Sequence, residues 1–212
     1  TGAKGDTGAK GDTGAKGEIG EAGPRGESGV VTNSQVKSIC GADGISPCTI
    51  GSRGPAGGIV FLTPTSSGNT TGLFYEAAPA GWNGTPADPE VEWCDITSTQ
   101  IGTLVPFGRE INGADKSAIM VGDCSAGAAI RSDIYSRVER GVTYADWFLP
   151  SIGELHAMWD RRALIGGFSE ILYWSSSEFS AMEAHVLTFD VNEEGGANAK
   201  SESHAVRPVR AF

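Results

Sequence analysis

The pattern of apolar and polar positions divides the chain into two unequal parts. Up to Gly29, Ile19 is the only large apolar residue, and glycine sets the period instead. Glycine recurs at every third position without a break: Gly2, Gly5, Gly8, Gly11, Gly14, Gly17, Gly20, Gly23, Gly26 and Gly29. This Gly-X-Y period is the signature of the collagen triple helix, because only glycine fits at the axis where three chains meet. One chain cannot fill that axis alone, so residues 1–31 predict a collagen-like stalk and a homotrimer.

The X and Y positions of this repeat are rich in charge and poor in proline. Pro24 is the only proline, whereas acid–base pairs recur, as in Lys4 with Asp6 and Arg25 with Glu27. A base in Y and an acid in the next X position can pair between neighbouring chains, and each exposed pair contributes about 0.2–1 kcal/mol. We therefore expect charge pairs to stabilise the stalk; a disordered glycine-rich linker is the alternative.

Apolar runs bounded by turn residues predict strands and helices after a neck and connector at residues 32–53. The expected strands are 57–62, 73–78, 172–178, 185–191 and 205–212, with hairpin loops at 63–71 and 192–198. A helix is expected over 115–129, with 130–138 as its extension, and a second helix begins at Ser151. Ser151 and Glu154 have capping-box spacing, and Gly166 and Gly167 end this second helix. These elements predict an α+β head over residues 54–212, in which the first and last strands pair.

Four cysteines allow three disulfide pairings. Cys40 and Cys48 enclose glycine, aspartate and proline, which are turn formers, so we favour a Cys40–Cys48 bridge. That choice leaves Cys94 to pair with Cys124. An even number of cysteines on a collagen-like chain is typical of an oxidising compartment. We therefore expect an extracellular location, and the spacings do not match a zinc site.

Acidic residues outnumber basic ones, and the net charge is −10. The repeat contributes only −1, from four bases and five acids, so the head is acidic. This charge argues against a nucleic-acid partner, because phosphate binding needs clustered lysine and arginine. It also disfavours simple electrostatic attraction to sulfated glycans. No apolar run approaches the roughly 20 residues that span a membrane, so we expect no membrane insertion.

The polar segment 79–95 contains the candidate ligand-binding residues. Loops on a rigid scaffold often carry binding, and the ring faces of Trp82 and Trp93 would suit the apolar face of a sugar. The alternative is that both tryptophans cap the core. Glu90 and Glu92 are acidic neighbours in the same segment, and paired carboxylates also serve glycoside hydrolysis. Because acidic pairs in loops are usually solvated, we predict a binding protein and not an enzyme.

Asp190, Asn192 and Glu194 follow the spacing that begins an EF-hand calcium loop. They are therefore candidate calcium ligands, and we expect no other cofactor. The twelfth position of that loop is Ser201 instead of glutamate, and strands flank it. The alternative is a polar hairpin tip whose turn is made by Gly195 and Gly196.

Three motifs follow one another in the head: GGIVF at 57–61 with YEAAP at 75–79, DWFLPS at 146–151 running into Glu154 and Leu155, and YWSSSE at 173–178 with VRPVR at 206–210. In order and spacing they resemble the C-terminal domain of the Legionella collagen-like adhesin and its bacterial and phage relatives. The resemblance covers about residues 54–212. It implies a C-type-lectin-like head, with a mixed sheet and short helices, and trimeric assembly. It also implies binding of a cell-surface glycan or protein, on a bacterial surface or at a phage tail-fibre tip.

This chain departs from the family in its charge. The adhesin is associated with sulfated polysaccharides, but this acidic head has no evident basic patch, so that ligand is not carried over. The wider fold also includes formylglycine-generating enzymes, which use reactive cysteines. We expect all four cysteines here to form disulfides, so that activity is not carried over either. The alternative function is a trimerisation foldon, which would bring the three stalk chains together in register and bind no ligand.

Overall fold

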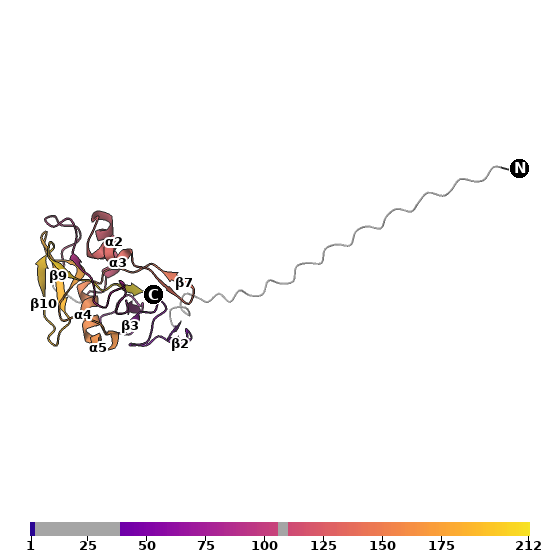
Figure 1. Ribbon diagram of the computed structural model, residues 1–212, viewed down its shortest axis with the longest axis horizontal. Coiled ribbons are helices and arrows are strands. Elements are labelled where there is room, and N and C mark those ends of the chain that lie inside the picture. Colours follow the sequence, from indigo (N-terminus) through magenta and orange to yellow (C-terminus); the bar gives the residue numbers. More distant parts are fainter. Residues whose placement is uncertain (3–38, 106–109) are drawn as a thin grey trace. The chain divides into compact units, whose positions relative to one another are not determined.

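The structure is a computed structural model that describes residues 1–2, 39–105 and 110–212. The predicted stalk, together with residues 32–38 of the neck, lies outside the described residues. Residues 32–212 form one unit, separate from residues 1–31, and the fold described here is that of this second unit (Figure 1).

Five strands form the largest sheet of this unit. In sheet order they are β10 (Gly195–Ala199), β9 (Glu183–Thr188), β8 (Leu172–Glu178), β11 (Ser203–Ala205) and β5 (Glu90–Glu92). β11 runs parallel to β8 and the other pairs are antiparallel, so the sheet is mixed. The central strand β8 is buried along nearly all of its length.

A second, antiparallel sheet has the order β12 (Val209–Ala211), β4 (Tyr75–Ala77) and β3 (Ile59–Leu62). The predicted hairpin of the first two head strands is therefore confirmed as β3 and β4. The expected pairing of the first and last strands is wrong, because the last strand pairs with β4. The outer edge of β3 is already occupied: Gly51 N donates to Val60 O at 2.8 Å, and Val60 N donates to Ser52 O at 2.9 Å.

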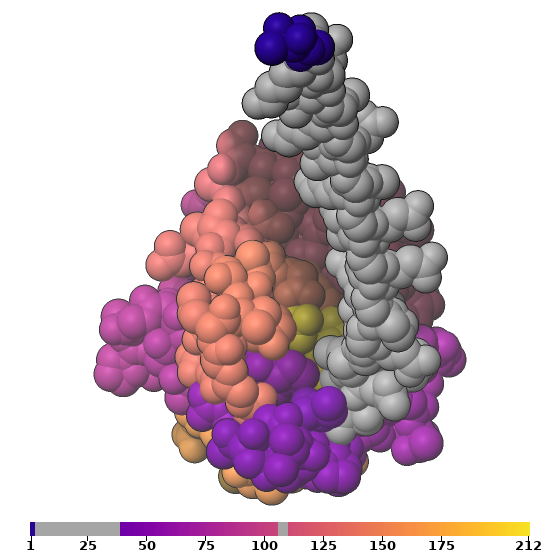
Figure 2. Space-filling model, turned by 90° about the vertical axis from the view of Figure 1, so that its right-hand side faces the viewer, coloured from indigo at the N-terminus to yellow at the C-terminus, as the bar shows by residue number. Residues whose placement is uncertain are grey.

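Two short hairpins complete the strands. They are β1 (Ile39–Cys40) with β2 (Ser46–Pro47), and β6 (Arg137–Glu139) with β7 (Val142–Tyr144). The helix extension predicted over 130–138 is helical only as far as Asp133, in α3, and its last two residues belong to β6. Figure 2 shows one face of the unit, on which purple residues from the β1–β3 part of the sequence adjoin orange residues from the α4–α5 part.

Four helices are described: α2 (Gly113–Asp123), α3 (Ala128–Asp133), α4 (Ile152–Asp160) and α5 (Arg162–Ile165). The single helix predicted over 115–129 is instead divided between α2 and α3. Gly127 lies at the break with a φ of 119°, and a Cβ at this position would be 2.6 Å from Trp93 O. The capping box at the start of α4 is confirmed, because Ser151 Oγ accepts from Glu154 N and Glu154 Oε2 accepts from Ser151 N.

The strands of the five-stranded sheet and the end of the chain differ from the predictions in three places. The loop predicted over 192–198 is shorter, because β10 occupies most of it with small residues that give no apolar alternation. β5 lies in a segment interpreted as a loop, since an exposed edge strand has little apolar signal. The strand predicted over 205–212 is divided between two sheets at Pro208, whose carbonyl accepts from Ala78 N at 2.9 Å.

Both disulfides are formed, Cys40–Cys48 and Cys94–Cys124, and this is the pairing that the sequence favoured. The unit is thus an α+β fold with two internal cross-links. No helix in the described part of the chain is long and apolar enough to cross a membrane.

Ion pairs inside the core fix loops that are remote in sequence. Lys200 Nζ contacts Glu178 Oε1, and both side chains are buried. Lys200 Nζ also donates to Thr99 O and Ala181 O, each at 2.9 Å, while Glu178 Oε2 accepts from Gly102 N at 2.8 Å. The pair therefore joins the β8–β9 turn to the segment around residue 100.

A second buried pair joins Asp88 to Arg207. Arg207 Nη2 lies 2.7 Å from Asp88 Oδ2, and Arg207 Nε donates to both carboxylate oxygens. Tyr173 Oη donates to Asp88 Oδ2 at 2.8 Å, and burial raises the pKa of this tyrosine above its usual value. Asp88 thus connects the segment before β5 to β8 and to the approach to β12.

Replacing one partner of a buried ion pair tests whether these pairs stabilise the fold. Lys200→Met leaves the Glu178 charge buried without its cation, so we expect the free energy of unfolding to fall by about 3–5 kcal/mol in urea denaturation. The double variant Lys200→Met with Glu178→Gln should recover part of that loss. Arg53→Met, in the more exposed Arg53–Glu139 pair, should cost less than about 1 kcal/mol. Equal losses in the two single variants would contradict the account.

Candidate ligand-binding groove

The structure places both candidate tryptophans in the core. Trp82 is 9% exposed and Trp93 is 1% exposed. Trp82 Nε1 donates to Asp88 Oδ1 at 2.9 Å, and Trp93 Nε1 donates to Ser175 O at 2.7 Å. Neither indole offers a ring face to solvent, so the sugar-stacking role predicted for them is corrected. They cap the core, which is the alternative that the sequence left open.

Glu90 and Glu92 lie on β5, an edge strand of the five-stranded sheet. Both side chains are exposed, and their spacing of two places them on the same face of the strand. They do not line the groove described below, and Val91 between them is partly buried against the core. As a binding surface, this pair stays a prediction.

The segment with Asp190, Asn192 and Glu194 forms the turn between β9 and β10. Asp190 Oδ1 accepts from Asn192 N at 2.8 Å, and Glu194 O accepts from Thr188 N at 2.8 Å. These bonds belong to a polar hairpin tip. The turn proposed at Gly195 and Gly196 is wrong in position, because both residues already belong to β10.

Metal-ligand clusters are scarce in the part of the chain that the structure describes. The one group of three or more histidine, cysteine, aspartate or glutamate side chains close enough to hold an ion is Cys94, Asp95 and Cys124. Its two sulfurs are bonded to each other, so they are not available as thiolate ligands. The calcium ligands expected at Asp190, Asn192 and Glu194 stay a prediction.

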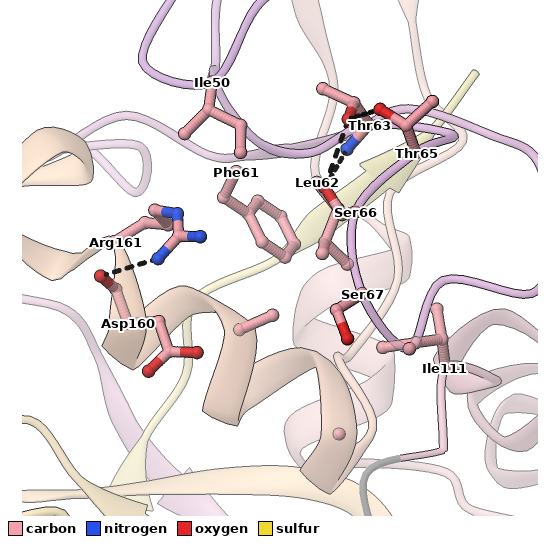
Figure 3. Close-up of a pocket in the computed structure, with 13 residues that line it drawn as sticks. Ile50, Phe61, Leu62, Thr63, Thr65, Ser66, Ser67, Ile111, Asp160 and Arg161 are labelled. Atoms are coloured by element: carbon pink, nitrogen blue, oxygen red, sulfur yellow. Dashed lines mark hydrogen bonds between the residues drawn. The ribbon is translucent and has the colours of Figure 1, made fainter.

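A groove of about 400 Å³ lies between the loop 63–68 and helix α4 (Figure 3). Phe61 and Leu62, at the end of β3, contribute its apolar side, together with Ile111. On α4, Gly153 and Ala157 line it. These two residues are four apart and share one helix face, and their small size keeps the space open.

One wall of the groove consists of hydroxyl side chains. Thr63 N donates to Ser66 Oγ at 2.9 Å, and Thr63 Oγ1 lies 3.3 Å from Thr65 Oγ1. Asn69 closes this loop, because its Nδ2 donates to Thr63 O at 2.8 Å and to Leu73 O at 2.7 Å. The hydroxyls of Thr63 and Ser66 are thus held in place before any ligand arrives.

The other end of the groove is charged. Asp160 is the last residue of α4 and Arg161 is its C-cap, with Arg161 Nη1 donating to Asp160 O at 3.2 Å. Figure 3 shows the Arg161 side chain beside Phe61, with Asp160 below it. The C-terminus of a helix carries a partial negative charge, so this end of the groove disfavours anions.

The wall that contains Ile111 is held to α4 by its N-terminal capping residues. Ser151 Oγ donates to Glu110 O at 2.7 Å, and Glu154 Oε1 accepts from Gly113 N at 3.1 Å. Gly113 is required here, since a Cβ at this position would lie 2.1 Å from Glu154 Oε2. Burial is the main cause that raises the pKa of Glu154 to about 7.

The sequence identified none of the groove residues as a site. The capping box pointed to Ser151 and Glu154, but it gave no sign that both also hold the segment 110–113. The cluster of serines and threonines at 63–67 looked like a hairpin loop, and this was the one available signal. No protein-family model matches this chain, and no curated protein matches it.

The titration of Glu154 gives a test of this anchoring. Between its ordinary pKa of 4.5 and its folded value of about 7, the folded chain keeps a proton that the unfolded chain releases. The free energy of unfolding should therefore fall as the pH rises through this window. Glu154→Gln removes that contribution. Across this pH window the free energy of unfolding of the variant should therefore fall by about 2–3 kcal/mol less than that of the unmodified chain, as measured by urea denaturation at several pH values.

The exposed Glu92→Gln variant is the matched control for Glu154→Gln. It should keep the pH dependence of the unmodified chain. A Glu154→Gln variant whose stability changes with pH as steeply as that of the unmodified chain would contradict the assignment.

Proposed function

We propose that this chain is a trimeric adhesive or receptor-binding module of the extracellular surface. In this proposal residues 1–31 form a collagen-like stalk, residues 32–53 connect it, and residues 54–212 form a C-type-lectin-like head. The head binds a cell-surface glycan or protein, on a bacterial surface or at a phage tail-fibre tip. The observation that carries the proposal is the unbroken glycine period on the same chain as a disulfide-bonded α+β unit.

The motifs that suggest kinship with the Legionella collagen-like adhesin are mostly buried. Glu76, Trp147, Trp174 and Arg207 each come from one of them, and all four side chains lie in the core. Such residues bear on the fold that relatives would share, and they contact no ligand. We therefore assign ligand choice to exposed loops, which carry none of these motifs.

The second candidate function is a trimerisation foldon, and exposed apolar residues favour it. Ile45 is 79% exposed, and Val138 and Val142 are 66% and 50% exposed. The hairpins that carry them meet, because Arg140 Nη2 donates to Gly41 O. This apolar surface lies on one hairpin of the connector and one of the head, and it would suit contacts between copies of the chain.

Replacement of a repeat glycine tests the stalk. Gly14→Ala puts a methyl group at the crowded axis of a triple helix, so the thermal transition of the triple helix should move to lower temperature or vanish. Circular dichroism of the full chain measures this transition, and sedimentation equilibrium measures the trimer. Ala15→Ser, at the neighbouring X position, is the matched control and should change little. A monomeric full chain would overturn the proposal.

Binding separates the two candidate functions. The disulfide-intact full chain is applied to an array of neutral and acidic glycans and to host cell-surface proteins, with calcium and then with EDTA. Specific binding supports the receptor-binding module, and a signal lost with EDTA places the site in the acidic loops. A trimer that binds nothing on either set of targets supports the foldon.

A further inference from the structure

We infer that the groove between the loop 63–68 and α4 binds a neutral saccharide. This inference rests on the proposed receptor-binding function and names the ligand class of the groove. It is carried by the groove's shape, by its hydroxyl and apolar lining, and by its charge.

The groove extends beyond its first hollow. A second hollow of about 520 Å³ shares Gly68 and Ile111 with it, and Glu110 and Asn112 line the far side. The two hollows are continuous along the loop 63–70, so the surface admits a short chain of sugar units.

The lining matches the two kinds of surface on a pyranose. The hydroxyls of Thr65 and Ser67 both donate and accept, as do the hydroxyls around a sugar ring. Asp160 supplies an acceptor and Arg161 a forked donor at the same end. The apolar side, to which the half-buried side chains of Ile111 and Ala157 contribute, suits the C–H face of the ring.

The charge around the groove argues for a neutral ligand. Among the described residues that line the two hollows, Asp160 and Glu110 are acidic and Arg161 is basic, and Lys116 Nζ lies 3.9 Å from Glu110 Oε2. The C-terminal end of α4 adds a partial negative charge, and the whole chain carries −10. No cluster of basic side chains lines the described part of the groove, so it offers a sulfated or carboxylated glycan few partners.

The backbone beside the groove argues against an extended peptide. A peptide that adds to a sheet needs a free strand edge, and β3 is the strand next to the groove. The outer edge of β3 already exchanges hydrogen bonds with Gly51 and Ser52. Side-chain hydroxyls therefore remain as the main recognition groups of the groove.

The test blocks the groove in the full chain. Ser67 is exposed on the wall, so Ser67→Trp fills the groove, and Ser98→Trp on another exposed loop is the matched control. Both variants and the unmodified chain are titrated with the best neutral oligosaccharide from the array, and thermal melting verifies folding. We expect affinity to fall at least about tenfold in Ser67→Trp and to stay unchanged in Ser98→Trp. Asp160→Asn, a nearly isosteric change of an exposed side chain, should also weaken binding.

The outcomes separate this inference from the function on which it rests. Binding of a neutral saccharide that survives both Ser67→Trp and Asp160→Asn would overturn the groove assignment and leave the receptor-binding function standing. Binding of acidic glycans or of proteins alone would have the same consequence. Absence of any ligand for the trimer would overturn both.

Discussion

Buried carboxylates that hold remote backbone segments are the interaction on which this head depends. Glu76 accepts from Ala56 N at 3.1 Å and from Gly58 N at 2.9 Å, and Glu154 and Glu178 hold other loops in the same way. A buried charge is costly unless it is paired and hydrogen-bonded, and burial raises the pKa of Glu76 despite its contact with Arg210. Few other loop conformations would satisfy these buried carboxylates. The contacts therefore give a loop-rich unit a single conformation.

The groove is a consequence of this arrangement. Glu76 fixes the turn that leads into β3, whose last residues form the apolar side, and Glu154 fixes the segment that carries Ile111. Asn69 fixes the hydroxyl loop from the third side. Because these contacts exist without ligand, little ordering entropy is lost when a ligand binds, which favours affinity. The segment that carries Ile111 is far in sequence from the other two, and the contact of Glu154 with Gly113 N holds it beside α4.

The sequence predicted the local features of the fold better than the long-range ones. The capping box at Ser151, the β3–β4 hairpin and the Cys40–Cys48 disulfide follow from residues close together in the chain, and the Cys94–Cys124 disulfide follows by elimination. The division of the helix at Gly127 depends on contact with Trp93, more than thirty positions away, and β10 consists of small residues without apolar alternation. The candidate site was misplaced for a related reason. Tryptophans suggested sugar stacking, whereas the groove is lined by serines and threonines that looked like an ordinary turn.

The central claim is that ligand binds in a groove held ready by buried carboxylates. Hydrogen–deuterium exchange of the full chain, with and without the best neutral oligosaccharide from the array, tests this claim most directly. The account predicts that slowed exchange on binding concentrates in residues 63–70 and 157–161, while the backbone amides of Ala56, Gly58 and Gly113 are already protected in the free protein. Protection confined to the β9–β10 turn or to β5, or fast exchange of those three amides before binding, would contradict it.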